Sequence, residues 1–324
     1  MKNVCIVGYG KIGPNHANAL SGVDSAKFYA VCDINDERIK KCQETFDVTG
    51  YTDFDEMLKD ENIHSVHICT PHYLHFDMIV KALKAGKTVV SEKPVTMTKE
   101  QFEELKNIEG SDKICLVFQN RLNDCSQKLK EVIESGVMGK LIAAKAIITW
   151  KRSAEYYLED EWRGKWDTEG GGVLINQTIH SLDLLSYFAG DICSVKANMM
   201  NYSLEKVIEV EDTMVAYLGF ENGAKGVFFA TNSFPVNSPV DIELVFENGT
   251  AKCVNDKLFI NDEIVAENEK PKIGKAYWGS SHKRLLKEFY DEGKYFTIND
   301  AENTMNTLFA MYESAKNDGK EVLI

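Results

Sequence analysis

Short apolar runs alternate with helical patterns along the first third of the chain. They predict strands at residues 4–7, 28–32, 65–70, 88–91 and 114–118, and helices at 14–20, 36–46, 54–58, 75–85 and 98–108. Strands that alternate with helices indicate a parallel sheet joined by right-handed crossovers. Such sheets bind ligands beyond the carboxyl ends of their strands, so the polar residues at those ends become candidates for a site.

The second part of the chain has a different pattern. A helix at 124–135 precedes strands expected at 140–151, 193–202, 212–220, 224–233, 240–247 and 250–260. Two junctions are Asn-Gly, at 222–223 and 248–249, which is a hairpin signal and favours antiparallel pairing. Helices expected at 173–189, 282–292 and 300–317 would help to cover one face of this sheet.

The length of 324 residues allows two domains, each with its own core. We therefore predict an α/β protein, with a parallel sheet in residues 1–121. The second α/β domain, residues 122–324, is expected to contain a large, mostly antiparallel open sheet.

The turn after the first strand reads GYGKIG. Gly8 would make the tight turn, Gly10 would let the backbone approach a pyrophosphate, and Gly13 would let the helix pack on the strand. The second strand delivers Asp33 twenty positions after Gly13, where a carboxylate meets a ribose 2′-hydroxyl. This pattern indicates a Rossmann domain, and Asp33 favours NAD over NADP because it would repel a 2′-phosphate. Arg38 could reach the same place, although a solvated helix face also explains it.

Composition limits the classes of binding partner and the cellular compartment that we expect. Lys and Arg number 37 against 50 Asp and Glu, a net charge of -13, which argues against nucleic acid or an anionic membrane as a partner. The eight cysteines contain no CxxC pair, and buried thiols in a reducing cytosol explain them. We expect a cytoplasmic protein, without a signal segment, a membrane span or a metal site.

Two stretches carry the residues most suited to catalysis. Lys93 lies in Glu92-Lys93-Pro94 at a strand end, where Pro94 favours an extended backbone. In the glycine-preceded helix, Asn176 and His180 would share a face, with Asp183 three residues further on. Asp183 could orient the His180 imidazole or cap a neighbouring backbone segment.

The segment between these stretches is rich in aromatic and basic side chains. Lys151, Tyr156 and Arg163 lie in this loop-like region and suit the binding of rings and of carboxylate or phosphate groups. Together with Asn176 and Gln177 they are our candidates for substrate binding. An aromatic loop that is simply pinned on the sheet would also account for part of the pattern.

Further cofactor candidates lie in the glycine turn, at strand ends or in the loop. They are Tyr9, Lys11, Ile12, Thr70, Pro71, His72, His75, Glu92, Lys93, Gln119, Arg121, Trp162 and Arg163. His16, His64 and His67 are interpreted as structural.

With GYGKIG, Asp33, EKP and GGGVLINQTIH in this order, the chain resembles the glucose-fructose oxidoreductase and inositol dehydrogenase family (Gfo/Idh/MocA) from end to end. The resemblance implies that the first domain binds NAD(P) and that the second supplies the substrate pocket. The family lysine maps onto Lys93 and the family histidine onto His180. The aspartate usual in that motif is Asn176 here, and asparagine cannot act as a base.

The NQTIH variant, with the preceding YY, WRG and GGG, is similar to the sugar-nucleotide branch, notably UDP-N-acetylglucosaminuronate 3-dehydrogenases. That resemblance implies oxidation of a pyranose C3 hydroxyl, with Trp162 and Arg163 near the nicotinamide. His180 would serve as the base and Lys93 would stabilise the alkoxide, although a depressed Lys93 pKa would reverse these roles.

Other substrates and functions stay open. The substrate could be a sugar, a polyol or a nucleotide sugar. The family also contains NAD-dependent glycosidases, and a non-catalytic NAD-binding sensor is a further alternative. The open sheet favours a homo-oligomer, a dimer or a tetramer.

Overall fold

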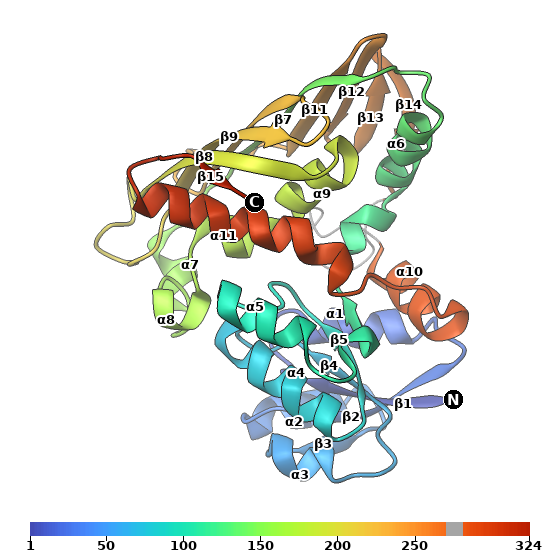
Figure 1. Cartoon of the computed structure of the whole chain (residues 1–324). Coiled ribbons are helices and arrows are strands. Elements are labelled where there is room, and N and C mark those ends of the chain that lie inside the picture. The colour runs from blue at the N-terminus through green and yellow to red at the C-terminus, as the bar shows by residue number, and fades with distance from the viewer. Residues whose placement is uncertain (270–280) are drawn as a thin grey trace. The chain divides into compact units, whose positions relative to one another are not determined.

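The computed structural model describes residues 1–269 and 281–324, which form two compact units (Figure 1). The first unit comprises Met1–Thr96, Glu100–Gln119 and Lys270–Ala301, and the remainder forms the second. Residues 281–301 thus belong to the first unit, although the sequence assigned them to the second domain. They pack there because Tyr290 hydrogen-bonds to Ser65 and a late helix lies against the first helix.

A six-stranded parallel sheet forms the centre of the first unit. Its order is β3 (Thr49–Tyr51), β2 (Ala26–Cys32), β1 (Lys2–Val7), β4 (Ser65–Ile68), β5 (Thr88–Ser91) and β6 (Ile114–Leu116). The chain proceeds outward in one direction from β1 and in the other from β4, so the strand order reverses between them. This reversal is the point at which doubly wound sheets bind their ligands.

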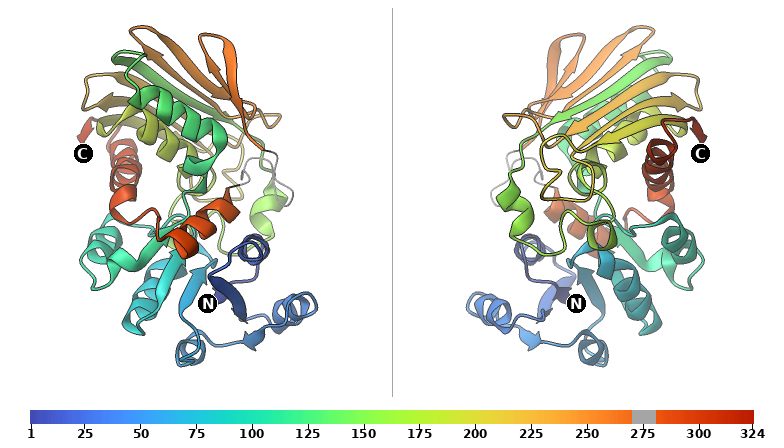
Figure 2. Two further views of the ribbon diagram at one scale, coloured as in Figure 1. Left: turned by 90° about the vertical axis from the view of Figure 1, so that its right-hand side faces the viewer. Right: turned by 90° about the vertical axis from the view of Figure 1, so that its left-hand side faces the viewer.

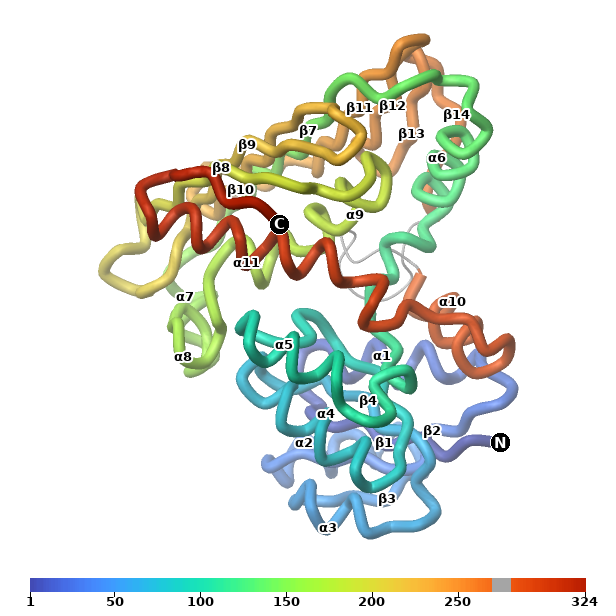
Figure 3. The backbone as a smooth tube through the Cα atoms, viewed as in Figure 1, coloured from blue at the N-terminus to red at the C-terminus, as the bar shows by residue number. Residues whose placement is uncertain are grey.

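Helices connect these strands where the sequence predicts them. They are α1 (Gly13–Leu20), α2 (Asp36–Gln43), α3 (Phe54–Leu58), α4 (His75–Lys84) and α5 (Lys99–Lys106), with short 3₁₀ turns η1 (His72–Leu74) and η2 (Ser111–Lys113). Asn35 and Asp53 cap α2 and α3 by accepting backbone N–H bonds, which explains where these helices begin. The late segment adds α10 (His282–Lys287), η6 (Glu288–Glu292) and η7 (Asn299–Ala301). Figure 3 traces α10 beside α1.

The second unit is built on a nine-stranded sheet. Its order is β14 (Glu263–Glu267), β13 (Lys257–Ile260), β12 (Gly249–Val254), β11 (Asp241–Phe246), β7 (Leu141–Thr149), β10 (Lys225–Thr231), β9 (Thr213–Phe220), β8 (Ile192–Met200) and β15 (Val322–Leu323). Only β7 and β10 pair in parallel among these strands. The predicted fold class, a Rossmann sheet plus a largely antiparallel sheet, is confirmed.

Three helices pack on one face of this sheet, as both views of Figure 2 show. They are α6 (Asp124–Glu134), α9 (Ile179–Ala189) and α11 (Glu302–Lys316). The rest of the unit carries α7 (Ala154–Leu158), α8 (Trp166–Glu169), the π-helical turn η4 (Val173–Gln177) and the 3₁₀ turn η3 (Gln119–Leu122) that leads into it.

The prediction of a single strand at 250–260 is wrong. The chain turns at Asn255-Asp256 and again at Asn261-Asp262, with positive φ at all four residues. Paired positive φ angles are those of the tight turns that join antiparallel strands. Asn-Asp is a weaker hairpin signal than Asn-Gly. The sequence analysis therefore did not predict the turns that separate β12, β13 and β14.

The prediction of a single helix at 173–189 is also wrong. The chain forms the π-helical turn η4, breaks at Thr178 with ψ near 6°, and begins α9 at Ile179. Thr178 stabilises the break because its hydroxyl donates to the carbonyl of Val173. Asn176 and His180 therefore lie in different helical elements, and α-helical spacing does not relate their directions. Isolated π turns recur at functional sites.

Within residues 1–269 and 281–324, no helix combines the length and the apolar character that crossing a bilayer requires.

Candidate active site

In the glycine turn of the first unit, the first and third glycines are closely packed and the second borders open space. Gly8 has φ +86°, and a Cβ there would lie 2.7 Å from the carbonyl oxygen of Cys69. A Cβ on Gly13 would lie 2.6 Å from the carbonyl oxygen of Gly8. On Gly10, by contrast, the nearest atom would be Arg38 Nη1 at 3.9 Å. The first and third glycines thus allow close packing, and the space over Gly10 fits a pyrophosphate.

Asp33 is fixed beside this turn. Its Oδ2 accepts the Tyr9 N–H at 2.7 Å, and its Oδ1 accepts the Asn35 N–H at 2.9 Å. Arg38 Nη1 lies 3.5 Å from the same carboxylate and is half-exposed. The carboxylate is therefore held at the end of β2 before any ligand arrives, with further lone pairs to accept ribose hydroxyls. Lys11 and Ile12 lie in the same turn.

His75 joins two of the predicted cofactor loops. Its Nδ1 lies 2.7 Å from the carbonyl oxygen of Pro94, and its Nε2 lies 2.8 Å from that of Thr70. The ring is buried, and both nitrogens face backbone oxygens. His75 therefore holds the loop containing Pro71 and His72 against the loop containing Lys93. This contact gives His75 a structural role, and a direct cofactor contact of His75 stays a prediction.

Lys93 follows the end of β5 and is partly buried. The preceding Glu92 is buried, and its Oε2 lies 3.3 Å from the Lys93 backbone nitrogen. Gln119 is buried at the end of the last segment of this sheet. Thr70, Glu92 and Gln119 thus lie just beyond the ends of neighbouring parallel strands, as predicted.

In the second unit, the aromatic and basic loop makes its own ion pairs. Arg163 lies 2.8 Å from Asp160, donates to the carbonyl of Tyr156, and stacks over the rings of Tyr156 and Trp162. The charge of Arg163 is therefore balanced locally, which makes it less available to a substrate anion. Lys151 is exposed at the bridge that its backbone forms with Ser233.

Gln177 offers a buried acceptor to a ligand in this unit. Its Nε2 donates to the Tyr156 hydroxyl at 3.3 Å. Its Oε1 is buried and accepts no hydrogen bond within the described parts of the chain. A buried amide oxygen without a donor is costly, so a ligand with a hydroxyl or N–H group would satisfy it.

Asn176 is oriented by a carboxylate that the sequence analysis missed. Glu169, fully buried at the end of α8, accepts hydrogen bonds from the Asn176 side-chain amide and from the Gly164 N–H. Because the amide nitrogen faces Glu169, the Asn176 carbonyl oxygen points away from that carboxylate. The available signal was a glutamate directly before three glycines.

Glu211 fixes the other end of the same segment. It accepts the N–H groups of Gly172 and Leu174 at 2.9 and 3.0 Å and the Tyr312 hydroxyl at 3.0 Å. The sequence analysis missed Glu211 too. The available signal was the acidic pair that begins an apolar strand, because carboxylates are rarely buried there unless hydrogen bonds satisfy them. Glu169 and Glu211 together determine the shape of the turn that carries Asn176 and Gln177.

These two carboxyls make stability depend on pH. Burial raises the pKa of Glu169 and of Glu211 to about 7, from 4.5. A pKa that is raised on folding stabilises the protein at low pH, and the contribution is lost as pH rises from the unfolded value to the folded one. We expect the free energy of unfolding, measured by urea denaturation, to fall between pH 5 and pH 8, by an amount on the order of 3 kcal/mol for one such carboxyl titrating alone.

Glu211→Gln should flatten this pH dependence relative to the wild type, and the exposed Glu205→Gln should leave it unchanged. Equal slopes in the wild type and Glu211→Gln would contradict the assignment to these carboxyls.

Arg121 and Asp183 form a buried ion pair. Arg121 Nε and Nη2 donate to the two Asp183 oxygens at 2.9 and 2.6 Å, and Thr304 adds a bond at 2.9 Å. Asp183 therefore neither orients the His180 imidazole nor caps a backbone segment, and both expectations are wrong. The pair ties η3 to α9, which gives Arg121 a structural partner. A cofactor contact of Arg121 stays a prediction.

Asp183→Ala should lower the free energy of unfolding by about 3–5 kcal/mol, because it leaves the Arg121 charge buried without its counterion. Urea denaturation measures this loss. Asp55→Ala, which removes an exposed pair with Lys81, is the matched control and should cost less than about 1 kcal/mol. Similar losses in the two variants would contradict the structural role of the buried pair.

His180 occupies the first turn of α9 and is partly buried. It belongs to the second unit, whereas Lys93 belongs to the first. The structure thus groups the glycine turn, Asp33, His75 and Lys93 in one unit, and Tyr156, Arg163, Asn176, Gln177 and His180 in the other.

Comparison with known proteins supports the family resemblance that the sequence motifs indicate. A family profile described as "Oxidoreductase family, NAD-binding Rossmann fold" matches residues 2–119, and one described as "GFO/IDH/MocA C-terminal domain" matches residues 126–252. Myo-inositol 2-dehydrogenase of Thermotoga maritima is 29% identical over 303 residues, which cover 91% of this chain and 86% of that protein. D-glucoside 3-dehydrogenase of Escherichia coli is 26% identical over 258 residues, covering 72% and 70%.

The crystal structure of the WlbA dehydrogenase from Bordetella pertussis, in complex with NADH and UDP-GlcNAcA, is similar over 100% of this chain and 97% of that chain. The TM-score is 0.89 at 27% identity. Since the two profiles together match most of the sequence, the chain belongs to the Gfo/Idh/MocA family of NAD-binding oxidoreductases.

Proposed function

We propose that this protein is an NAD-dependent dehydrogenase that oxidises a ring hydroxyl of a nucleotide sugar, at C3 of a UDP-N-acetylhexuronate. The observation that carries the proposal is the similarity, over the whole chain, to a dehydrogenase crystallised with NADH and UDP-GlcNAcA. The same similarity extends to the Chromobacterium violaceum WlbA complex, at 27% identity and a TM-score of 0.86.

The residues of the first unit fit NAD. The open space over Gly10 suits the pyrophosphate, and the fixed carboxylate of Asp33 suits the adenosine ribose and disfavours a 2′-phosphate. The bound nicotinamide would supply the chemistry by accepting a hydride from the carbinol carbon. The contribution of the protein is to orient the substrate and to take up the hydroxyl proton.

In this proposal His180 accepts the hydroxyl proton at a ring nitrogen, and the Lys93 ammonium stabilises the developing alkoxide. Asn176 cannot replace the aspartate usual in this family as a base, so it binds the substrate through its carbonyl oxygen. The buried Oε1 of Gln177 offers a second acceptor. Two neighbouring amide acceptors favour a substrate with several hydroxyl or N-acetyl N–H donors, which an N-acetylated sugar provides.

The test is NAD reduction, followed at the NADH absorbance, with UDP-sugars, UDP-sugar acids, inositols and free hexoses as substrates. Turnover confined to a UDP-uronic acid supports the proposal. Turnover of inositols alone would replace it with the second candidate, which the similarity to myo-inositol 2-dehydrogenase favours.

Two rivals predict other outcomes in the same assay. A glycosidase would cleave a chromogenic glycoside without net NADH formation, and a sensor would bind NAD without turning over any substrate.

We also propose that the protein is cytoplasmic, which is consistent with its eight free cysteines. We propose further that it forms a homo-oligomer, and light scattering would measure the number of subunits.

A further inference from the structure

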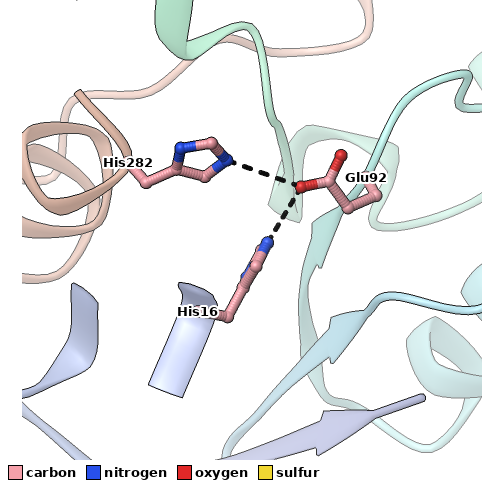
Figure 4. Close-up of side chains that lie close together, drawn as sticks. All are labelled: His16, Glu92 and His282. Atoms are coloured by element: carbon pink, nitrogen blue, oxygen red, sulfur yellow. Dashed lines mark hydrogen bonds and ion pairs between the residues drawn. The ribbon is translucent and has the colours of Figure 1, made fainter. Parts of the chain in front are cut away.

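Two imidazoles and a carboxylate of the first unit converge on one spot (Figure 4). His16 comes from α1, Glu92 directly follows β5, and His282 begins α10. Their three potential ligand atoms all lie within 4.8 Å of one another. These residues are far apart in the chain, so no spacing motif indicates the cluster, and the sequence analysis expected no metal site.

The distances between these atoms are those of a small coordination site. His16 Nε2 lies 3.0 Å from Glu92 Oε1, and His282 Nε2 lies 3.7 Å from the same oxygen. Two ligands that each bind one Zn²⁺ at about 2.0–2.1 Å in a tetrahedral arrangement are about 3.3 Å apart. The two observed distances lie on either side of this value. The longer one is too long for a good hydrogen bond, whereas a shared ion would satisfy both atoms.

Burial and charge also suit a divalent cation. The side chain of His16 is 1% exposed, that of Glu92 9% and that of His282 12%. A buried carboxylate requires a cation or hydrogen-bond donors beside it, and neutral imidazoles bind a metal without adding charge. The exposed part of His282 makes one ligand reachable from solvent.

The bonds behind His16 allow its Nε2 to bind a metal. His16 Nδ1 lies 2.9 Å from His67 Nδ1, and His67 Nε2 lies 2.8 Å from the Tyr290 hydroxyl. Two neutral rings satisfy this row in either direction. If His67 donates to His16, the Nε2 proton of His16 is donated to Glu92. If His16 donates to His67 and His67 to Tyr290, which bonds to Ser65 at 2.7 Å, Nε2 of His16 offers a lone pair. The second direction is the one that metal-binding histidines use, because they donate their other N–H to a polar group.

We propose that His16, Glu92 and His282 bind a zinc ion, which ties α10 to α1 and to the end of β5. Two imidazoles and one carboxylate are ligands that Zn²⁺ accepts, and a water completes the tetrahedron. Mg²⁺ and Ca²⁺ prefer oxygen ligands alone. The ion fastens the late segment to the parallel sheet at a second place, besides the contact of Tyr290 with Ser65. Zinc binding here does not depend on dehydrogenase activity.

The first experiment is calorimetric titration of the full, reduced chain with ZnCl₂ after a chelator has removed bound metal. We expect one zinc ion per chain with a Kd below about 10 μM, and no binding of MgCl₂. His16→Gln and His282→Gln should each weaken zinc binding by at least about 100-fold. His64→Gln, which removes an exposed imidazole of the same unit, is the matched control and should bind zinc like the wild type. A wild type that binds no zinc, or that binds Mg²⁺ equally well, would overturn the site.

The second experiment identifies the ligands by replacing zinc with Co²⁺. Nitrogen and oxygen ligands give weak visible absorption bands, whereas cysteine thiolates add an intense band in the near ultraviolet. We expect the visible bands alone, and we expect them to disappear in His16→Gln and His282→Gln. A thiolate band would assign the metal to some of the eight free cysteines. That result, or the same spectrum in the wild type and both variants, would refute the proposed ligands.

The third experiment tests whether the ion ties the late segment to the sheet. Zinc at about 100 times its Kd should raise the Tm of the wild type by more than about 3 °C, because it binds only the folded chain. It should also slow hydrogen exchange in α1 and α10. His282→Gln should lose both effects, and it carries the test if His16→Gln does not fold, because His282 is the most exposed of the three ligands. Zinc binding that leaves Tm and exchange unchanged would refute the tie.

Discussion

Replacing His180 with glutamine should lower kcat by about 10²–10⁴-fold while the NAD Kd changes by less than about threefold. Glutamine retains hydrogen-bonding groups but cannot accept the hydroxyl proton at neutral pH. The glycine turn that would hold the pyrophosphate belongs to the first unit and His180 to the second, and the substitution leaves that turn unchanged, so we expect cofactor affinity to persist. Steady-state kinetics on the substrate identified in the panel, with NAD titration by fluorescence, measures both quantities.

His64→Gln is the control for this variant, because His64 is exposed and its ring accepts a hydrogen bond from the backbone N–H of Asn3. It should retain wild-type kcat. Exogenous imidazole should partly restore turnover in His180→Ala, because it can take up the same proton. Wild-type kcat in a folded His180→Gln protein would remove this residue from the mechanism.

Replacing Lys93 with methionine should also lower kcat by about 10²–10⁴-fold, because the alkoxide would form without a cation beside it. Methionine keeps much of the apolar length of lysine and removes the ammonium. Stopped-flow measurement of NADH formation would place the loss in the hydride-transfer step. The exposed Lys84→Met is the control and should behave as the wild type.

Lys93→Arg separates the two roles that the sequence left open for this residue. Arginine keeps the charge but does not lose its proton in proteins, so partial activity indicates that Lys93 stabilises charge. If Lys93→Arg is as inactive as Lys93→Met while His180→Gln stays active, Lys93 is the proton acceptor and the assignment reverses.

Local patterns were sufficient for the parallel sheet of the first unit and the helices between its strands, although not for residues 281–301, which join this unit from far along the chain. Its strands are short, apolar and separated by amphipathic helices, and a glycine turn followed by an acid at a fixed spacing has few other structural meanings. The position of Lys93 beyond β5 follows from the same pattern, since the end of an apolar run marks the edge of the sheet.

Local patterns failed where the backbone departs from regular periods. The π-helical turn η4 and the α-helix α9 both contain apolar residues at helical spacing, so the break at Thr178 left no periodic signal. The turns at Asn255-Asp256 and Asn261-Asp262 depend on positive φ angles that these residues tolerate but do not require.

The sequence by itself predicted the two-sheet fold, which is confirmed, and it supplied the hypotheses that the glycine turn binds the cofactor, that Asp33 favours NAD and that Lys93 and His180 handle the proton. These follow from residues near one another in the chain. Only the tertiary structure decided which partners the buried ionisable side chains have: Glu211 bonds to the turn after Gly172, Arg121 to Asp183, and His16 to Glu92. A buried charge requires a partner, but any of several distant residues could satisfy it, and folding selects one by bringing separate strands and helices together.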